Sequence, residues 1–168
     1  PTLQSRCWPV RFGTAARGVI EEALKERGHD AARAKLFAAL SEGRTGWAIA
    51  NAESRAEEIE AARQEVISLL GGLPQISSGG ILRFAERLRE IAGEYFREEA
   101  AEDDEESARA AVGGERALRA ALPPVLDLVA CWLRDIMLTS QKARQLVVNE
   151  DYAGVLSEQA SSVGGDEI

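Results

Sequence analysis

Few residues of this chain have side chains suited to catalysis or metal binding. Its 168 residues include one histidine, His29, in a predicted turn beside Gly28, and two cysteines, Cys7 and Cys131, which lie far apart. A single histidine cannot build a multi-histidine metal site, and isolated turn residues are mostly solvated. Phosphate-loop, dinucleotide-binding and H-E-x-x-H motifs are absent from the sequence. We therefore predict no bound cofactor and no metal site.

One short motif, Ser5-Arg6-Cys7, stands out among the remaining polar residues. The guanidinium of Arg6 is planar and always charged, so it is suited to stabilising negative charge on a phosphate. Taken alone, three residues are better explained by a structural arginine. The meaning of the motif therefore depends on the elements that position it.

Helical periodicity dominates the rest of the chain. We predict helices at about 15–27, 31–42, a short one from Thr45, 53–70, 81–99, 117–138, and a short one around Tyr152. The most apolar of them, 117–138, contains Pro123-Pro124, and we expect the helix to start anew near Pro123. Residues 1–12 are predicted to be extended, and 161–168 to be a disordered tail.

Composition favours an all-α protein. The chain is 45% hydrophobic but 5% aromatic, and alanine, leucine, glutamate and arginine are good helix formers. Its net charge of -8 repels phosphate, so protein partners are expected rather than direct nucleic-acid contact. Isolated cysteines indicate a reducing, cytoplasmic location, and no apolar run reaches the roughly 18 residues of a membrane span.

The order of these features resembles that of clamp-loader ATPase subunits, which belong to the AAA+ class and serve bacterial DNA polymerase III. In that family a Ser-Arg-Cys triplet closes the nucleotide-binding domain, ahead of helical domains. The resemblance implies that Arg6, with Ser5 and Cys7 as its motif, acts in trans as an arginine finger on a neighbour's ATP. It also implies a domain order: 1–12 remnant of the nucleotide-binding domain, 13–72 helical lid, and 73–168 collar, the oligomerisation domain.

Two further segments carry the resemblance. Residues 41–49 resemble the lid segment that holds a second sensing arginine in ATP-hydrolysing relatives, and Gly46 stands at its place, with Arg44 two positions earlier. The W-x-R-D run 132–135 and the N-x-D turn 149–151 resemble the collar sequence. The glycine in place of the sensing arginine, together with the two collar matches, implies a subunit that does not sense nucleotide itself.

The expected role is therefore structural, with no activity in this piece of the chain. Partners implied by the resemblance are clamp-loader subunits of the gamma or tau and delta types, bound through the collar, with no membrane contact. The candidate interface residues are Leu126, Trp132, Leu133 and Leu138. Two alternatives remain open: a gamma or tau type ATPase subunit, and an unrelated helical interaction module. The acidic stretch 98–106 has no assigned partner.

Overall fold

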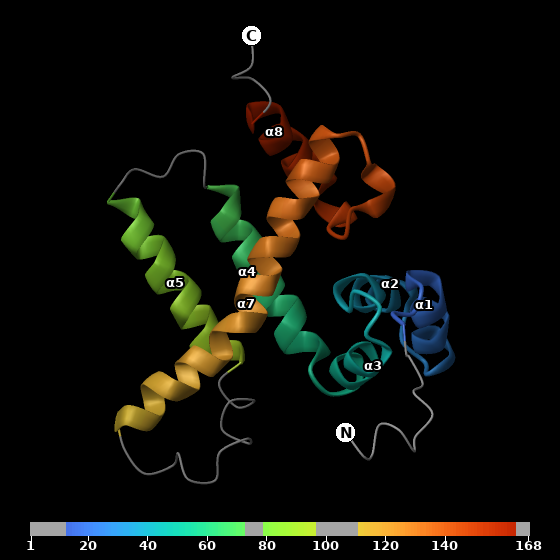
Figure 1. Ribbon diagram of the computed structural model, residues 1–168, viewed down its shortest axis with the longest axis horizontal. Helices are drawn as coiled ribbons and strands as arrows, with labels where there is room; N and C mark the ends of the chain where they lie inside the picture. Colours follow the sequence, from blue (N-terminus) through green and yellow to red (C-terminus); the bar gives the residue numbers. More distant parts are fainter. Residues whose placement is uncertain (1–12, 73–78, 97–110, 164–168) are drawn as a thin grey trace, which may run out of the picture. The chain divides into compact units, whose positions relative to one another are not determined.

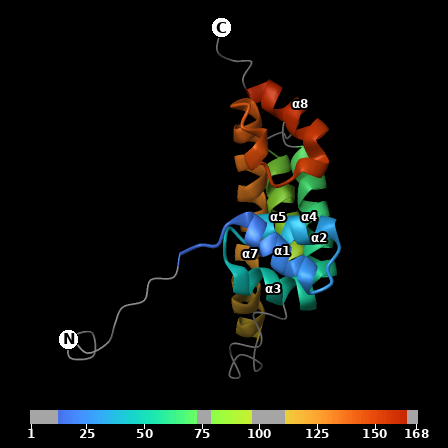
Figure 2. The same ribbon diagram turned by 90° about the vertical axis from the view of Figure 1, so that its right-hand side faces the viewer.

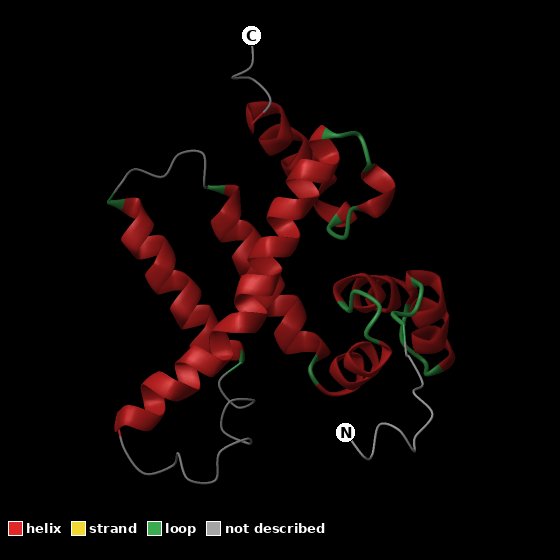
Figure 3. Ribbon diagram, in the orientation of Figure 1, coloured by secondary structure: helices red, strands yellow, loops and turns green. Residues whose placement is uncertain are grey.

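The computed structural model describes residues 13–72, 79–96 and 111–163 (Figure 1). Every regular element in these ranges is a helix, which confirms the all-α prediction (Figure 3). The elements are α1 (Arg17–Glu26), α2 (Ala31–Leu40), α3 (Thr45–Ser54), α4 (Ala56–Gly71), α5 (Gly80–Tyr95), α7 (Ala111–Ser140), the 3-10 turns η3 (Arg144–Leu146) and η4 (Glu150–Tyr152), and α8 (Ala153–Val163). No helix within the described ranges is long and apolar enough to cross a membrane.

The chain divides into two compact units between Ser54 and Arg55. The predicted boundary near residue 72 is therefore wrong. Helix α4 belongs to the second unit, because it packs against α5 and α7 and buries Val66 and Leu70 completely. Gly71-Gly72 ends a helix without separating two domains, since an element's packing partners are not set by its stop signal.

The first unit consists of α1, α2 and α3, which pack on one another. Ile20 and Leu24 of α1 and Phe37 of α2 are fully buried, in keeping with their helical spacing. The Phe37 ring stacks on Trp47 of α3, with ring centroids 6.3 Å apart. These side chains form the core of the unit.

Two loop residues fix the turns of the first unit. The Asp30 carboxylate accepts a hydrogen bond of 3.0 Å from the backbone N–H of Arg33, which caps α2 and holds the pKa of Asp30 below its usual value. Gly43 has φ of 87°, and a Cβ there would lie 2.6 Å from the Cβ of Thr14. Its carbonyl accepts a 3.0 Å hydrogen bond from Ala15 N–H. Only glycine fits this close approach.

The second unit consists of α4, α5, α7 and α8 with the two 3-10 turns. Helix α7 is its long central element and packs against α4, α5 and α8 (Figures 1 and 2). The core side chains Val66, Ile91, Val125, Trp132 and Leu156 are each at most 1% exposed. The apolar pattern of residues 117–138 thus predicted the central helix of this unit.

Helix α7 runs without interruption through Pro123 and Pro124, so the predicted restart near Pro123 is wrong. Each proline removes one N–H, and the carbonyls left without that donor belong to Arg119 and Ala120. Both residues are exposed, so water can bind their carbonyls. The ribbon changes direction between its yellow and orange parts in Figure 1, as expected of a helix bent at proline.

The last helix is longer than predicted. Helix α8 continues through Val163, so residues 161–163 of the predicted tail are helical, and the rest of that tail, 164–168, lies outside the described ranges. Ser161 Oγ donates to the Ser157 carbonyl at 2.8 Å, a bond that a serine can make within a helix.

Candidate functional site

The predicted arginine finger lies outside the described residues. Ser5, Arg6 and Cys7 all fall in the segment 1–12, as does the proposed remnant of a nucleotide-binding domain. Their role therefore stays a prediction. The acidic stretch 98–106 is also outside the described ranges.

Gly46, which stands where relatives have the sensor arginine, lies in the first turn of α3. A Cβ at Gly46 would meet no atom within 4 Å, so a side chain there has room. Arg44, two positions earlier, is exposed, and its side chain contacts its own turn. Its Nε donates a 2.9 Å hydrogen bond to the Ser41 carbonyl, and its guanidinium lies 5.6 Å from the ring centroid of Trp47. The guanidinium of Arg44 is therefore turned back onto the start of its own helix.

The residues of the W-x-R-D run and the N-x-D turn meet in one buried cluster. Asp135 of α7 is fully buried, and one of its carboxylate oxygens accepts three hydrogen bonds. The donors are the backbone N–H of Val148 at 3.0 Å, the backbone N–H of Asn149 at 2.8 Å and the Asn149 side-chain amide at 2.7 Å. The second oxygen lies 3.7 Å from the Arg134 guanidinium. Asp135 thereby holds the segment after α7 against that helix.

Arg63 joins α4 to the same cluster. Its Nε donates to the side-chain oxygen of Asn149 at 2.8 Å, and its two terminal nitrogens donate to both carboxylate oxygens of Asp151 at 3.0 and 2.5 Å. The guanidinium also lies 5.2 Å from the Tyr152 ring centroid. Arg63 is 7% exposed, so this bidentate contact compensates a charge that is nearly excluded from water.

Trp132 belongs to the core of the second unit and not to an interface. Its side chain is fully buried, and its Nε1–H donates to Gln159 of α8 at 2.9 Å. Gln159 in turn donates to the Leu70 carbonyl at 2.8 Å, and the Tyr152 ring meets Trp132 edge to face at 6.1 Å. The prediction of Trp132 as an interface residue is therefore wrong, because the side chain is enclosed by α4, α8 and η4.

The role of this cluster is structural, because its side chains hold α4, α7 and the segment after α7 together. Burial, and then the charge of Asp135, raises the pKa of the Cys131 thiol beside it, which makes the thiol a poor nucleophile at neutral pH. The Arg63 guanidinium is committed to Asn149 and Asp151. Within the described ranges, no three histidine, cysteine or acidic side chains gather as metal ligands.

The opposite face of α7 carries an apolar surface that nothing in the described chain covers. Leu126 is 51% exposed, Leu133 is 45% exposed and Met137 is 68% exposed, and Ala130 between them is exposed too. Their spacing of i, i+4, i+7 and i+11 places them on one side of the helix, with no charged residue among them. We call these four residues the α7 stripe. The remaining predicted interface residue, Leu138, is half-buried and lies outside it.

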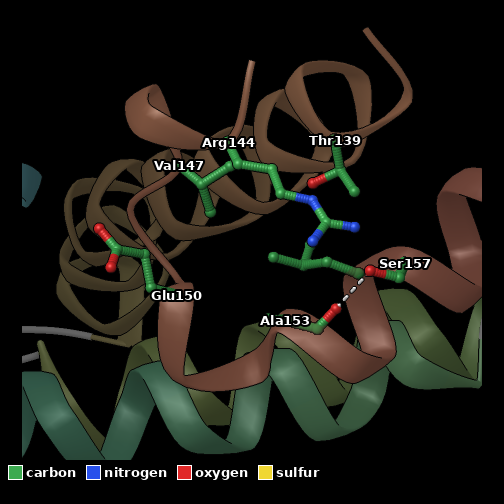
Figure 4. Close-up of a pocket in the computed structure, with 7 residues that line it drawn as sticks. Thr139, Arg144, Val147, Glu150, Ala153 and Ser157 are labelled. Carbon is green, nitrogen blue, oxygen red and sulfur yellow. Dashed lines mark hydrogen bonds between the residues drawn. The ribbon is translucent and has the colours of Figure 1, made fainter. Parts of the chain in front are cut away.

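A shallow pocket of about 230 Å³ opens between the end of α7, η3 and the start of α8 (Figure 4). Arg144 points across it toward Ser157, whereas the Glu150 carboxylate points away. The Thr139 and Ser157 hydroxyls donate to backbone carbonyls within their own helices. The pocket is smaller than the about 300–1,000 Å³ of typical ligand sites and holds no buried charged group, so we assign it no ligand.

Comparisons with known proteins assign no family to the chain. A scan against protein-family models, a search of curated proteins and a search of solved structures each found no match.

Proposed function

We propose that this chain is an oligomerising piece of a clamp loader, the AAA+ assembly that places a sliding clamp on primed DNA. Within that class, we propose the C-terminal part of a delta-prime subunit of bacterial DNA polymerase III. The observation that carries the proposal is the α7 stripe. A helix of a self-sufficient bundle turns its apolar residues inward, whereas α7 has large apolar side chains on two faces.

The buried cluster supports the same proposal from a second direction. The resemblance to clamp-loader subunits depends in part on Trp132, Asp135, Asn149 and Asp151. All four of these side chains belong to the buried cluster or contact it. Residues that carry a sequence pattern for structural reasons should contact one another in this way. The cluster holds the segment after α7 on the side of the helix opposite the α7 stripe, which leaves the stripe uncovered.

In the proposed role, the fragment works through contact and catalyses nothing. The second unit would pack beside equivalent bundles of neighbouring subunits and bury the α7 stripe there. Gly46 puts no side chain at the place of the sensor arginine, and Arg44 is engaged by the Ser41 carbonyl and the Trp47 ring, which suits a subunit that does not hydrolyse ATP. Arg6 would act on a neighbour's nucleotide, where a guanidinium stabilises charge that develops on the transferred phosphate.

Replacing Leu133 with glutamate should abolish assembly with partner subunits. The charge would have to be desolvated in the middle of an apolar contact, at a cost large enough to reduce affinity by about tenfold or more. The measurement is size-exclusion chromatography of purified gamma and delta subunits mixed with this chain at micromolar concentration. The unsubstituted chain should elute with its partners and Leu133→Glu should elute alone.

Leu82→Glu is the matched control for this experiment. Leu82 is 72% exposed on α5, so the substitution adds the same charge to an apolar site away from the α7 stripe. It should leave the shared peak in place. A wild-type chain that never shares a peak with gamma and delta would refute the clamp-loader proposal.

Replacing Arg6 with alanine in the full-length subunit should lower DNA-stimulated ATPase activity while leaving assembly intact. Loss of a trans-acting arginine removes stabilisation of the phosphoryl-transfer transition state, so we expect a reduction of about tenfold or more at the affected site. Arg11→Ala, in the same segment, serves as the control. Unchanged ATPase activity in Arg6→Ala would contradict the assignment of Arg6.

A further inference from the structure

We infer that the α7 stripe pairs with the α7 stripe of a second copy of this chain, in an antiparallel helix pair related by a twofold axis. The inference concerns the chain by itself and does not rest on the proposed function. It starts from the order of side chains along the stripe: Leu126, Ala130, Leu133 and Met137. A twofold interface requires a surface that is complementary to itself.

The sizes of the side chains meet that requirement. The stripe is symmetric about its midpoint, so in an antiparallel pair Leu126 faces Met137 of the other copy, and Ala130 faces Leu133. Ala130 is the one small residue, and it leaves room for a leucine to insert from the opposite helix. Met137, at 68% exposure, is flexible enough to adapt to Leu126. In each facing pair, one of the two side chains is thus small or adaptable.

Charges beside the stripe are arranged in the same self-complementary manner. Asp127 and Arg134 lie seven residues apart on one flank of α7, on opposite sides of the midpoint. In an antiparallel pair, equal flanks face each other, which places Asp127 of one copy near Arg134 of the other, offset by about 3 Å along the helix axis. Asp127 is exposed and forms no ion pair within the described ranges, and the Arg134 side chain is 39% exposed. In a parallel pair, equal flanks lie on opposite sides of the contact, so Asp127 of one copy would not face Arg134 of the other.

The size of the contact sets the expected strength. Four side chains from each copy bury less than the about 1,200 Å² of a standard specific interface, so the pair should be weak, with a dissociation constant on the order of 10–500 μM. Such a pair forms in concentrated solution and releases the α7 stripe when a better-matched surface is present. In the proposed clamp loader, a neighbouring subunit would therefore compete with the second copy for the same four residues.

Sedimentation equilibrium of the chain alone, at about 5 μM to 1 mM, tests the inference. We expect a reversible rise from the 18.1 kDa monomer toward twice that mass. Leu133→Glu should raise the dissociation constant by about tenfold or more, while Leu82→Glu on α5 should leave it unchanged. A chain that stays monomeric to 1 mM overturns the inference without touching the clamp-loader proposal, which is tested with other subunits present.

Ala130→Leu distinguishes the proposed geometry from general apolar adhesion. The substitution makes the stripe more hydrophobic, yet it fills the space that Leu133 of the second copy needs, so the dissociation constant should rise by about tenfold. Asp127→Arg should also weaken the pair, because it places two cations together. Tighter association of Ala130→Leu, or no change in either variant, would rule out the antiparallel pair.

Discussion

Replacing Asp135 with alanine should destabilise the second unit by about 3–5 kcal/mol. The carboxylate is fully buried and accepts three hydrogen bonds from the segment that follows α7. Without it, the backbone N–H groups of Val148 and Asn149 and the Asn149 amide lose their acceptor inside the protein, and each such loss costs about 1–3 kcal/mol. The Arg134 guanidinium also loses the buried charge 3.7 Å away.

Urea unfolding followed at Cys131 measures this loss in the second unit alone. The thiol is half-buried beside Asn149 and becomes reactive when the unit unfolds. A Cys7→Ser background leaves it as the single thiol of the chain. Asp127→Ala removes an exposed aspartate of the same helix and should change the free energy of unfolding by no more than about 0.5 kcal/mol. Equal losses in Asp135→Ala and Asp127→Ala would show that the buried cluster does not hold the unit together.

Local sequence patterns predicted the elements but not their assembly. Caps and periodicity placed most helix ends to within about four residues, because they act over one or two turns. The exceptions are α7, which begins at Ala111 instead of 117, and α8, which continues to Val163. The boundary at 72 failed because α4 takes its partners from residues far along the chain. Arg63 shows this most directly, since it bonds Asn149 and Asp151, which lie 86 and 88 residues away.

The position of Arg63 in the sequence did contain a signal that this arginine needs a buried partner. It lies four residues after Ile59 and three before Val66, on the face of α4 that both residues bury. A charged residue in such a position needs a buried partner, and acids or amides in a later turn are the first candidates. Asn149 and Asp151 stand out by their N-x-D pattern, but nothing in that pattern connects them with this arginine. Only the packing of α4 on α7 and η4 makes the connection.

Periodicity also left undecided which face of α7 is turned toward the core. Residues 117–138 are apolar on two sides, so the pattern indicated a stripe wider than one bundle needs without saying which side faces inward. The structure places Trp132 inside and Leu133 outside. That choice determines which side chains can meet a partner, and it can be tested by stability alone.

Replacing Trp132 with alanine should lower the free energy of unfolding of the second unit by about 3–5 kcal/mol. The substitution opens a large cavity, and it leaves the Gln159 oxygen without the indole N–H that donates to it. Trp132→Phe keeps most of the ring and loses the donor, so it should cost less, about 1–3 kcal/mol. Leu133→Ala, one position along the helix at 45% exposure, should stay within about 0.5 kcal/mol. The same urea titration at Cys131 compares all three. A loss in Leu133→Ala as large as that in Trp132→Ala would mean that α7 faces its core the other way, and the surface on which the association experiments depend would then not exist.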